Sequence, residues 1–327
     1  MLVISADEVD KALTFSGLVE TLHDAFREGA VQPVRHHHAI EQPGKAGATL
    51  LLMPAWTDFS QVKSEGKPKD NNGWIGVKIV TVAPENNKIG KPAVMGQYLL
   101  LDGATGEPRA LIDGQRLTQW RTACASALAS SYLSLPDSER LLMIGAGALS
   151  TFLVRAHAAV RPIKQVRIWN RTRERAVETA SQLQALGFAA DVADDLNAAL
   201  SWADIISSAT ISATPLVKGA FLKPGAHIDL VGAFTPDMRE SDDEAVAKAE
   251  IFVDTRDGAL KEAGDIVLAV KSGALKPEDV KADLYDLARS NHPVRSDAQA
   301  ITLFKSVGAA IEDLAAGVAV YQAIAKG

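Results

Sequence analysis

The feature that most constrains the fold is an apolar strand that runs directly into a glycine turn and a helix. Residues 141–150 read Leu-Leu-Met-Ile-Gly-Ala-Gly-Ala-Leu-Ser. In this arrangement the first glycine allows a tight turn, and the second lets the backbone approach a pyrophosphate, which then faces the amino end of the helix. A lone Gly-x-Gly is a weak signal, but here a second strand follows and ends at Trp169, so the sequence predicts a dinucleotide site. The predicted contacts are Gly145, Ala146, Gly147 and Ala148, followed by Ser150 in place of a third glycine.

Strands and helices alternate through this part of the chain. This alternation predicts an α/β fold with a doubly wound parallel sheet of the Rossmann type. The predicted strands are residues 141–144, 165–169, 205–208, 227–231 and 251–253, and the predicted helices are residues 149–160 and 173–186. A longer helix, rich in Ala and Ser, is expected before them over residues 117–135.

The first hundred residues have a different pattern. Ser5 and Glu8 have the spacing of a capping box, and the apolar pattern that follows to Phe26 predicts a helical start. After Pro33, short β-like runs alternate with turn-rich segments, which predicts an antiparallel meander without a dinucleotide motif. The runs are residues 35–40, 49–53, 74–82, 98–101 and 109–112. A last helix, about residues 311–325, is apolar on one side and is expected to pack against this region.

The composition limits the classes of protein. A chain of 327 residues, of which 47% are hydrophobic, can bury a large core, and its length suggests two domains. The formal net charge of −6 argues against sequence-independent nucleic-acid binding, which needs a basic face. Cys124 is the only cysteine, which excludes an intrachain disulfide and a zinc site of several cysteines.

Neither a signal peptide nor a membrane span is expected. Asp7, Glu8 and Asp10 stand where a signal peptide would be basic and then apolar. The most apolar stretch, residues 141–160, is interrupted by charged and polar residues. Because the single cysteine also fits a reducing compartment, a cytoplasmic protein without a membrane partner is expected.

The end of the second strand distinguishes between the two nicotinamide cofactors. An enzyme that uses NAD usually has Asp or Glu here, which accepts hydrogen bonds from the ribose hydroxyls. Residues 170–175 instead read Asn-Arg-Thr-Arg-Glu-Arg. Arginines suit a 2′-phosphate, and three of them at a helix amino end oppose the helix dipole, so a merely solvated surface is the weaker interpretation. NADPH is therefore expected rather than NADH, with contacts from Asn170, Arg171, Thr172 and Arg175.

Two further features look reactive but are interpreted otherwise. The consecutive His36, His37 and His38 cannot all ligate one ion, because adjacent side chains of a strand point to opposite faces. Cys124 is flanked by alanines and a serine, which favours a small buried residue over a nucleophile. No metal is expected.

Nine short blocks, in order along the chain, resemble the ornithine cyclodeaminase/mu-crystallin family. Each block alone is unspecific, whereas nine in order, from near residue 30 to the carboxyl terminus, are highly specific. The blocks are residues 76–80 (Gly-Val-Lys-Ile-Val), 121–123 (Arg-Thr-Ala), 145–147 (Gly-Ala-Gly), 169–172 (Trp-Asn-Arg-Thr), 223–227 (Lys-Pro-Gly-Ala-His), 231–233 (Val-Gly-Ala), 236–240 (Pro-Asp-Met-Arg-Glu), 262–265 (Glu-Ala-Gly-Asp) and 304–308 (Phe-Lys-Ser-Val-Gly).

The resemblance implies a homodimer with two domains per chain. Residues 1–117 and 307–327 would form an α+β domain for substrate binding and dimerisation, and residues 118–306 the dinucleotide domain. Family members include ornithine cyclodeaminases, an alanine dehydrogenase type and reductases of cyclic ketimines, and mu-crystallin binds thyroid hormone. Their substrates are small α-amino or α-imino acids, and hydride moves between the nicotinamide and the α-carbon. The resemblance extends the cofactor contacts to Thr122, Ser208, Thr210, Val231, Gly232 and Ser306.

A small carboxylate substrate needs a cationic clamp, which arginine supplies with two parallel hydrogen bonds. By resemblance the clamp is Arg35, Lys78 and Arg121, with Lys78 and Arg121 as the catalytic residues. Lys78 lies in an apolar strand, where a lysine is unfavourable without a partner. Without the resemblance, the same patterns fit a lysine on an edge strand and surface arginines.

One departure from the cyclodeaminases selects among the activities. Cyclodeaminases carry an acidic residue in the loop after the Val-Gly strand end, where this chain has Phe234 and Thr235. An apolar residue suits a ring without a charged tail, and the block at residues 169–172 also favours the ketimine reductases. The sequence therefore predicts NADPH-dependent reduction of Δ1-pyrroline-2-carboxylate or Δ1-piperideine-2-carboxylate. The alternatives are an ornithine cyclodeaminase, an alanine dehydrogenase type, and an NADPH-dependent binding protein without turnover.

Overall fold

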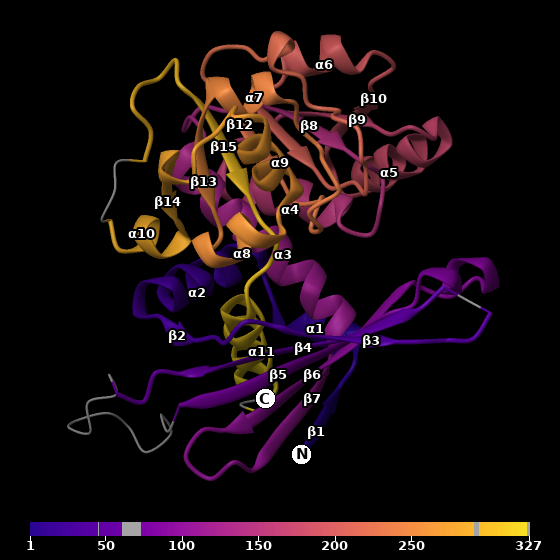
Figure 1. Cartoon of the computed structure of the whole chain (residues 1–327), viewed down its shortest axis with the longest axis vertical. Coiled ribbons are helices and arrows are strands. Elements are labelled where there is room, and N and C mark those ends of the chain that lie inside the picture. The colour runs from indigo at the N-terminus through magenta and orange to yellow at the C-terminus, as the bar shows by residue number, and fades with distance from the viewer. Residues whose placement is uncertain (45, 61–72, 291–293, 326–327) are drawn as a thin grey trace. The chain divides into compact units, whose positions relative to one another are not determined.

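Residues 1–121 and 309–327 form one unit, and residues 122–308 form the other. The computed structural model describes residues 1–44, 46–60, 73–290 and 294–325. The first unit contains a largely antiparallel sheet and the second a parallel sheet, which confirms the predicted fold class (Figure 1). Within the described ranges, no helix combines the length and the apolar character needed to cross a membrane.

The sheet of the first unit has the strand order β1-β7-β6-β5-β4-β2, and β3 pairs with β4. Strands β4 to β7 form the expected antiparallel meander. The short β1, which the sequence pattern does not predict, pairs parallel with β7. The bounds are β1 Leu2–Ile4, β2 Ala30–Val31, β3 His36–Ile40, β4 Ala48–Thr57, β5 Trp74–Val82, β6 Val94–Asp102 and β7 Pro108–Asp113.

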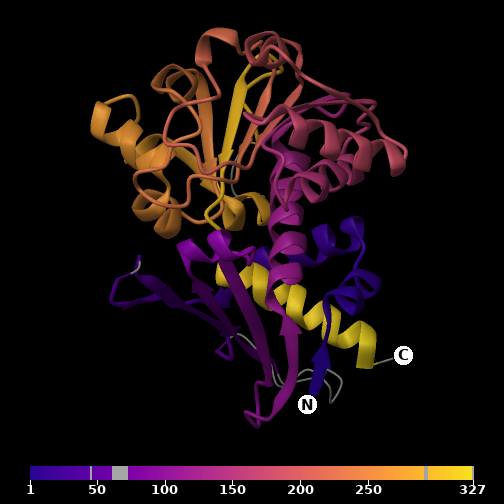
Figure 2. The same ribbon diagram turned by 90° about the vertical axis from the view of Figure 1, so that its right-hand side faces the viewer.

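The helices of the first unit pack on its sheet and on one another. The start of the chain contains α1 (Ala6–Ala12) and α2 (Phe15–Glu28), so the expectation of one continuous helical pattern is wrong. Ser5 and Glu8 do form the capping box, but Thr14 begins the second helix by accepting a hydrogen bond from the Gly17 amide. The last helix, α11 (Ala310–Ala325), packs on β4, β5 and β6 (Figure 2).

β5 shows how the two faces of this sheet differ. Gly76, Lys78 and Val80 are buried on the side of α11, whereas the alternate residues Ile79 and Thr81 are exposed. This alternation is the two-residue period of a strand with one covered face.

The second unit is an eight-stranded sheet in the order β10-β9-β8-β11-β12-β15-β13-β14, with every pair parallel. Helices cover both faces, as in doubly wound folds (Figure 1). The strand bounds are β8 Arg140–Ile144, β9 Gln165–Trp169, β10 Ala189–Val192, β11 Ile205–Ser208, β12 His227–Leu230, β13 Ala249–Val253, β14 Val280–Asp283 and β15 Ile301–Lys305.

A long helix, α3 (Gly114–Leu133), begins in the first unit and continues into the second. The other helices of the second unit are α4 Ser150–Val160, α5 Arg173–Ala185, α6 Leu196–Trp202, α7 Asp243–Lys248, α8 Arg256–Glu262, α9 Gly264–Ser272 and α10 Leu284–Ala288. The sequence pattern predicts α4 and α5 but not the shorter helices, nor β10, β14 and β15. The missed helices span too few turns for their apolar periodicity to be recognised.

Candidate active site

Two basic and two acidic side chains meet in the first unit. Lys78 of β5 and Arg121 of α3 contact Glu312 and Asp313 in the first turn of α11. Lys78 Nζ lies 3.1 Å from Asp313 Oδ1, and Arg121 Nε lies 3.2 Å from the same oxygen. Arg121 Nη1 lies 2.7 Å from Glu312 Oε2. We call these four residues the tetrad.

The tetrad is almost completely removed from solvent. Glu312 and Asp313 have no exposed surface, and Lys78 and Arg121 expose 5% and 6% of theirs. The interpretation of Lys78 as an edge-strand lysine and of Arg121 as a surface arginine is therefore wrong. Two positive and two negative charges cancel, which is the condition under which a protein interior tolerates them.

The buried position changes the chemistry of Lys78. Removal from water and the nearby Arg121 together lower the pKa of Lys78 to about 8, although Asp313 opposes the shift. A lysine with this pKa holds a proton at neutral pH and can release it to a substrate. The tetrad thus combines cations that can bind a carboxylate with a proton donor.

The acidic half of the tetrad is not among the residues singled out from the sequence. A signal was present, because Glu312 and Asp313 interrupt an otherwise apolar stretch between Ala309 and Val320. An acidic pair in an apolar helix needs buried partners, as a lysine in an apolar strand does.

The third predicted clamp residue, Arg35, precedes β3 and is partly buried, and it does not belong to the tetrad. His36, His37 and His38 are exposed on β3. The rings of His36 and His38 lie 6.3 Å apart, as expected for alternate residues of a strand. Cys124 is buried, and burial raises the pKa of its thiol far above the usual range, which agrees with its interpretation as a small buried residue.

The glycine turn of the second unit follows β8 and has the form of a phosphate cradle. Gly145 has a φ of 104°, and a Cβ there would lie 2.7 Å from the Ala209 carbonyl oxygen. Ser150 stabilises the turn, because its hydroxyl donates to the Gly145 carbonyl and accepts from the Gly147 amide. A Cβ on Gly147 would meet nothing within 4 Å, and no side chain caps α4, whose N-cap is Leu149. An open turn at an uncapped helix amino end fits a pyrophosphate.

The segment after β9 carries the arginines that the sequence analysis relates to a 2′-phosphate. Arg173 pairs with Asp194 at 2.9 Å, so two of the three arginines, not all three, remain candidates for binding the 2′-phosphate. Arg171 and Arg175 are exposed, and Asn170 donates a hydrogen bond to the Thr172 carbonyl at 2.8 Å. Asp194 follows β10, a strand that the sequence pattern does not predict, and for that reason its pairing was not foreseen.

Other predicted cofactor residues lie at the ends of β11, β12 and β15. The Val231 amide donates to the Ser208 carbonyl, and both the Ser208 and Thr210 hydroxyls donate to the Glu240 carboxylate. Ser306 directly follows β15, and its hydroxyl donates to Asp254. Thr122 lies elsewhere, buried on α3.

The loop after β12 carries Phe234, which the sequence analysis relates to the choice between ketimine reduction and ornithine cyclodeamination. Ala233 has a φ of 50°, which is rare for a residue with a side chain. The next residue, Phe234, exposes 45% of its surface. The ring is therefore available for contact with a small molecule rather than held in the core of this unit.

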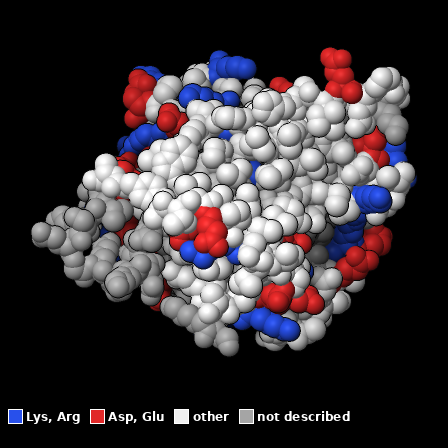
Figure 3. All heavy atoms as spheres, turned by 90° about the horizontal axis from the view of Figure 1, so that it is seen from below, with Lys and Arg blue, Asp and Glu red and all other residues white. Residues whose placement is uncertain are grey.

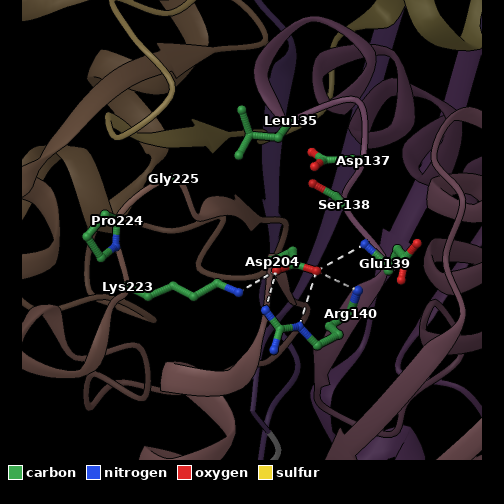
Figure 4. Close-up of a pocket in the computed structure, with 9 residues that line it drawn as sticks. All are labelled: Leu135, Asp137, Ser138, Glu139, Arg140, Asp204, Lys223, Pro224 and Gly225. Carbon is green, nitrogen blue, oxygen red and sulfur yellow. Dashed lines mark hydrogen bonds and ion pairs between the residues drawn. The ribbon is translucent and has the colours of Figure 1, made fainter.

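A pocket of the second unit lies at the opposite, amino edge of the same sheet (Figure 4). Its side chains converge on Asp204, which accepts hydrogen bonds from Lys223, from the Arg140 guanidinium and amide, and from the Glu139 amide. These bonds hold the pKa of Asp204 at about 2 despite its partial burial. Ligands of open α/β sheets bind at the carboxyl ends of the strands, so we interpret this network as structural.

The chain matches the family model described as the ornithine cyclodeaminase/mu-crystallin family over residues 2–327. It is 40% identical to a Delta(1)-pyrroline-2-carboxylate reductase of Paracoccus denitrificans, over 87% of this chain and 89% of that protein. Among solved structures, the Delta(1)-pyrroline-2-carboxylate reductase of Thermococcus litoralis, in complex with NADH and L-proline, superposes with a TM-score of 0.90 at 31% identity, covering 100% of this chain and 98% of the other. An archaeal alanine dehydrogenase dimer with bound NAD superposes with a TM-score of 0.88 at 28% identity, covering 100% and 96%.

Proposed function

Because the chain belongs to the ornithine cyclodeaminase/mu-crystallin family, we propose that it is a cytoplasmic enzyme that reduces a cyclic ketimine carboxylate to the cyclic L-amino acid. Reduction of Δ1-pyrroline-2-carboxylate to L-proline represents the reaction, and Δ1-piperideine-2-carboxylate is the substrate with the larger ring. The observation that carries this proposal is the buried tetrad, which offers two cations and a proton donor with a lowered pKa.

In this proposal Arg121 and Lys78 bind the substrate carboxylate, with Arg35 as a third cation. Asp313 and Glu312 hold the two cations in place. The imine nitrogen must carry a proton before the adjacent carbon accepts a hydride, and Lys78 is the acid that we assign to this step. The bound dinucleotide supplies the hydride, and the product is a secondary amine with one new C–H bond and one new N–H bond.

NADPH is the proposed cofactor. Arg171 and Arg175, exposed after β9, can form charge-assisted hydrogen bonds with a 2′-phosphate. The similar enzymes of known structure bind NADH or NAD, so the preference rests on these two arginines alone. The glycine turn, Thr122, Ser208, Thr210, Val231, Gly232 and Ser306 complete the proposed cofactor contacts.

Alanine dehydrogenation is the second candidate, favoured by the structural similarity to the archaeal enzyme. Ornithine cyclodeamination is disfavoured because the second amine of ornithine needs a carboxylate partner and a base, and Phe234 offers neither. Thr235 is too weak a base at neutral pH. A binding protein without turnover would not need a proton donor beside its cations.

A panel of substrates tests the proposal. Oxidation of NADPH and of NADH is followed with the five- and six-membered ketimine carboxylates and with pyruvate plus ammonia, and ornithine is tested with catalytic NAD. We expect the fastest turnover with a cyclic ketimine and NADPH.

Lys78→Met should strongly reduce turnover and leave dinucleotide affinity unchanged, whereas Lys248→Met, which alters an exposed lysine of α7, should change neither. Faster turnover of pyruvate or ornithine would reject the ketimine assignment, and a higher efficiency with NADH would reject the cofactor preference.

We also propose a homodimer formed through the face of the first unit's sheet that lies opposite α11. Ile79 and Met95 expose 38% and 44% of their surfaces, and they share a face because Met95 pairs with Thr81, two residues from Ile79. Uncharged residues, polar and apolar alike, make up most of the surface that Figure 3 shows. An exposed apolar sheet face of this kind is typical of an interface between subunits.

A further inference from the structure

Three charged side chains are buried beneath the carboxyl ends of β11, β12 and β15. They are Lys305 at the end of β15, Glu240 in the segment before α7 and Asp265 in the first turn of α9, and none exposes any surface. Lys305 Nζ lies 3.2 Å from Asp265 Oδ2 and 3.9 Å from Glu240 Oε2. We call these residues the buried triad. The proposed reaction assigns no role to it.

The triad is bonded to the segments that follow β11 and β12. Glu240 Oε1 accepts hydrogen bonds from the Ser208 hydroxyl at 2.6 Å and from the Thr210 amide and hydroxyl, both at 2.8 Å. Lys305 donates to the Gly232 carbonyl. A Cβ on Gly232 would lie 2.7 Å from Glu240 Oε2, so the loop backbone rests directly on the carboxylate.

The sheet topology relates these segments to one half of the dinucleotide. The glycine turn follows β8, and the strand order reverses between β8 and β11. In sheets of this type the dinucleotide crosses that point, and each half of the sheet receives one mononucleotide. Since β9 carries the arginines proposed for the adenosine 2′-phosphate, the half formed by β11, β12 and β15 receives the nicotinamide.

The charge of the triad depends on one proton. With all three groups ionised the triad carries one net negative charge away from solvent, and protonation of Glu240 makes it neutral. Burial raises the pKa of Glu240 to about 7, with Lys305 lowering it, Asp265 raising it, and the Ser208 and Thr210 hydrogen bonds lowering it. The nicotinamide ring also changes charge, because the oxidised ring is a cation and the reduced ring is neutral.

We propose that the buried triad couples the protonation of Glu240 to the redox state of the bound nicotinamide. The anionic triad favours the oxidised ring, and the neutral triad favours the reduced ring. Glu240 is then a positioning residue that also sets the local charge, so acidic conditions favour the cofactor form needed for reduction. This inference rests on the dinucleotide part of the proposed function and is independent of the substrate.

The test measures binding rather than turnover. Dissociation constants of NAD⁺, NADH, NADP⁺ and NADPH are determined by fluorescence and calorimetry between about pH 6 and pH 9. The ratio of the oxidised to the reduced constant should fall roughly tenfold as the pH rises through the pKa of Glu240, an electrostatic effect of one buried charge. Ionisation of the 2′-phosphate cancels in this ratio, and NAD⁺ with NADH lack that group altogether.

Glu240→Gln keeps an oxygen acceptor for Ser208 and Thr210 but cannot titrate. In this variant the ratio of the oxidised to the reduced dissociation constant should be independent of pH. Asp229→Asn is the matched control, because Asp229 is an equally buried carboxylate of this unit that pairs with His157 and Ser207. It should keep the pH dependence of the unmodified protein. The pH series of dissociation constants for the unmodified protein tests the coupling even if a variant does not fold. Proton uptake on binding is measured in two buffers with the same protein.

The outcomes separate the two proposals. Binding of both redox forms with a ratio that does not change with pH would overturn the coupling and leave the proposed function standing. An unchanged pH dependence in a folded Glu240→Gln variant would also overturn it. If no nicotinamide dinucleotide binds at all, both proposals fail.

Discussion

Arg121 bridges two carboxylates through different nitrogens of one planar group, Nε to Asp313 and Nη1 to Glu312. The ammonium group of a lysine cannot reproduce this fork, so Arg121→Lys should lower the catalytic efficiency although the charge is kept. Loss of one charge-assisted hydrogen bond costs about 1.5–3 kcal/mol, which predicts a decrease in kcat/KM for the ketimine of roughly 10- to 150-fold. NADPH affinity should not change, and Arg140→Lys, at the opposite edge of the second unit's sheet, serves as control. An unchanged kcat/KM would remove Arg121 from the clamp.

His227 should make acid stability depend on one buried imidazole. It has no exposed surface, and its Nδ1 lies 2.9 Å from the Thr302 hydroxyl, which itself donates to the Leu133 carbonyl. Burial lowers the pKa of His227 from its ordinary value of 6.5 to about 3. The folded protein therefore keeps His227 neutral while the unfolded chain takes up a proton below pH 6.5, so its contribution to stability is lost as the pH falls from 6.5 towards 3.

The measurement is the free energy of unfolding of the unmodified protein minus that of His227→Asn, which retains an amide donor to Thr302. Below the pKa of His227 in the unfolded chain, this difference should decrease by about 1.4 kcal/mol for each pH unit. Glu240, whose pKa is raised, has the opposite pH dependence, but it is present in both proteins and cancels. A difference that stays constant from neutral pH to about pH 4.5 would contradict the assignment.

At the scale of single residues, the sequence identifies charges that need partners but not the partners themselves. Lys78 stands out in an apolar strand, yet Asp313 lies 235 residues away and only the fold brings the two together. Arg173 is one of the three arginines that suggest a 2′-phosphate site, yet it pairs with Asp194, which lies 21 residues further along the chain. Spacing along a chain carries no information about such long-range pairs.

Among the helices, α11 contains a glycine whose replacement by alanine should destabilise the protein, although helix propensity alone predicts stabilisation. Gly317 lies in the helix interior, where replacement by alanine ordinarily stabilises by about 1 kcal/mol. Here a Cβ would lie 2.6 Å from the ring of Tyr98, which is also in close contact with Gly76 of β5. Gly317→Ala should therefore destabilise the protein by about 1–3 kcal/mol, the usual range for overpacking.

Thermal unfolding of Gly317→Ala, beside Gly317→Ala combined with Tyr98→Phe or Tyr98→Leu, measures this effect. The smaller leucine should relieve the clash, whereas phenylalanine should relieve little of it because the ring remains. A stabilised Gly317→Ala protein would show that α11 does not pack on Tyr98 in this way.

Long or strongly patterned elements are the ones that the sequence predicts correctly. The strand 74–82 and the strand 165–169 have the predicted bounds, and α4 and α5 differ from prediction by one residue each. The missed helices are short. β15 is as long as the correctly predicted β9, but it lies between β12 and β13 in the sheet although it follows both of them in the chain. Strand order of this kind depends on tertiary packing and leaves no local pattern.

For the whole molecule, the proposed dimer depends on the sheet face of the first unit that lies opposite α11. Ile79→Asp places a charge on this face without touching Lys78, because successive residues of β5 point to opposite sides. Light scattering coupled to size exclusion should show a dimer for the unmodified protein and a shift toward monomer for Ile79→Asp. Lys248→Asp, on α7 of the second unit, is the control and should remain dimeric. A monomer in the unmodified protein at micromolar concentration would contradict the proposal.

The proposed function requires that this enzyme transfer a hydride to the α-carbon of a cyclic ketimine carboxylate. NADPH that carries deuterium at both C4 positions is incubated with the enzyme and Δ1-pyrroline-2-carboxylate, and the products are analysed by mass spectrometry. We expect L-proline with a single deuterium on its α-carbon, formed in equal amount to the oxidised cofactor. Cofactor oxidation without deuterated proline, or no proline at all under conditions in which NADPH binds, would contradict it.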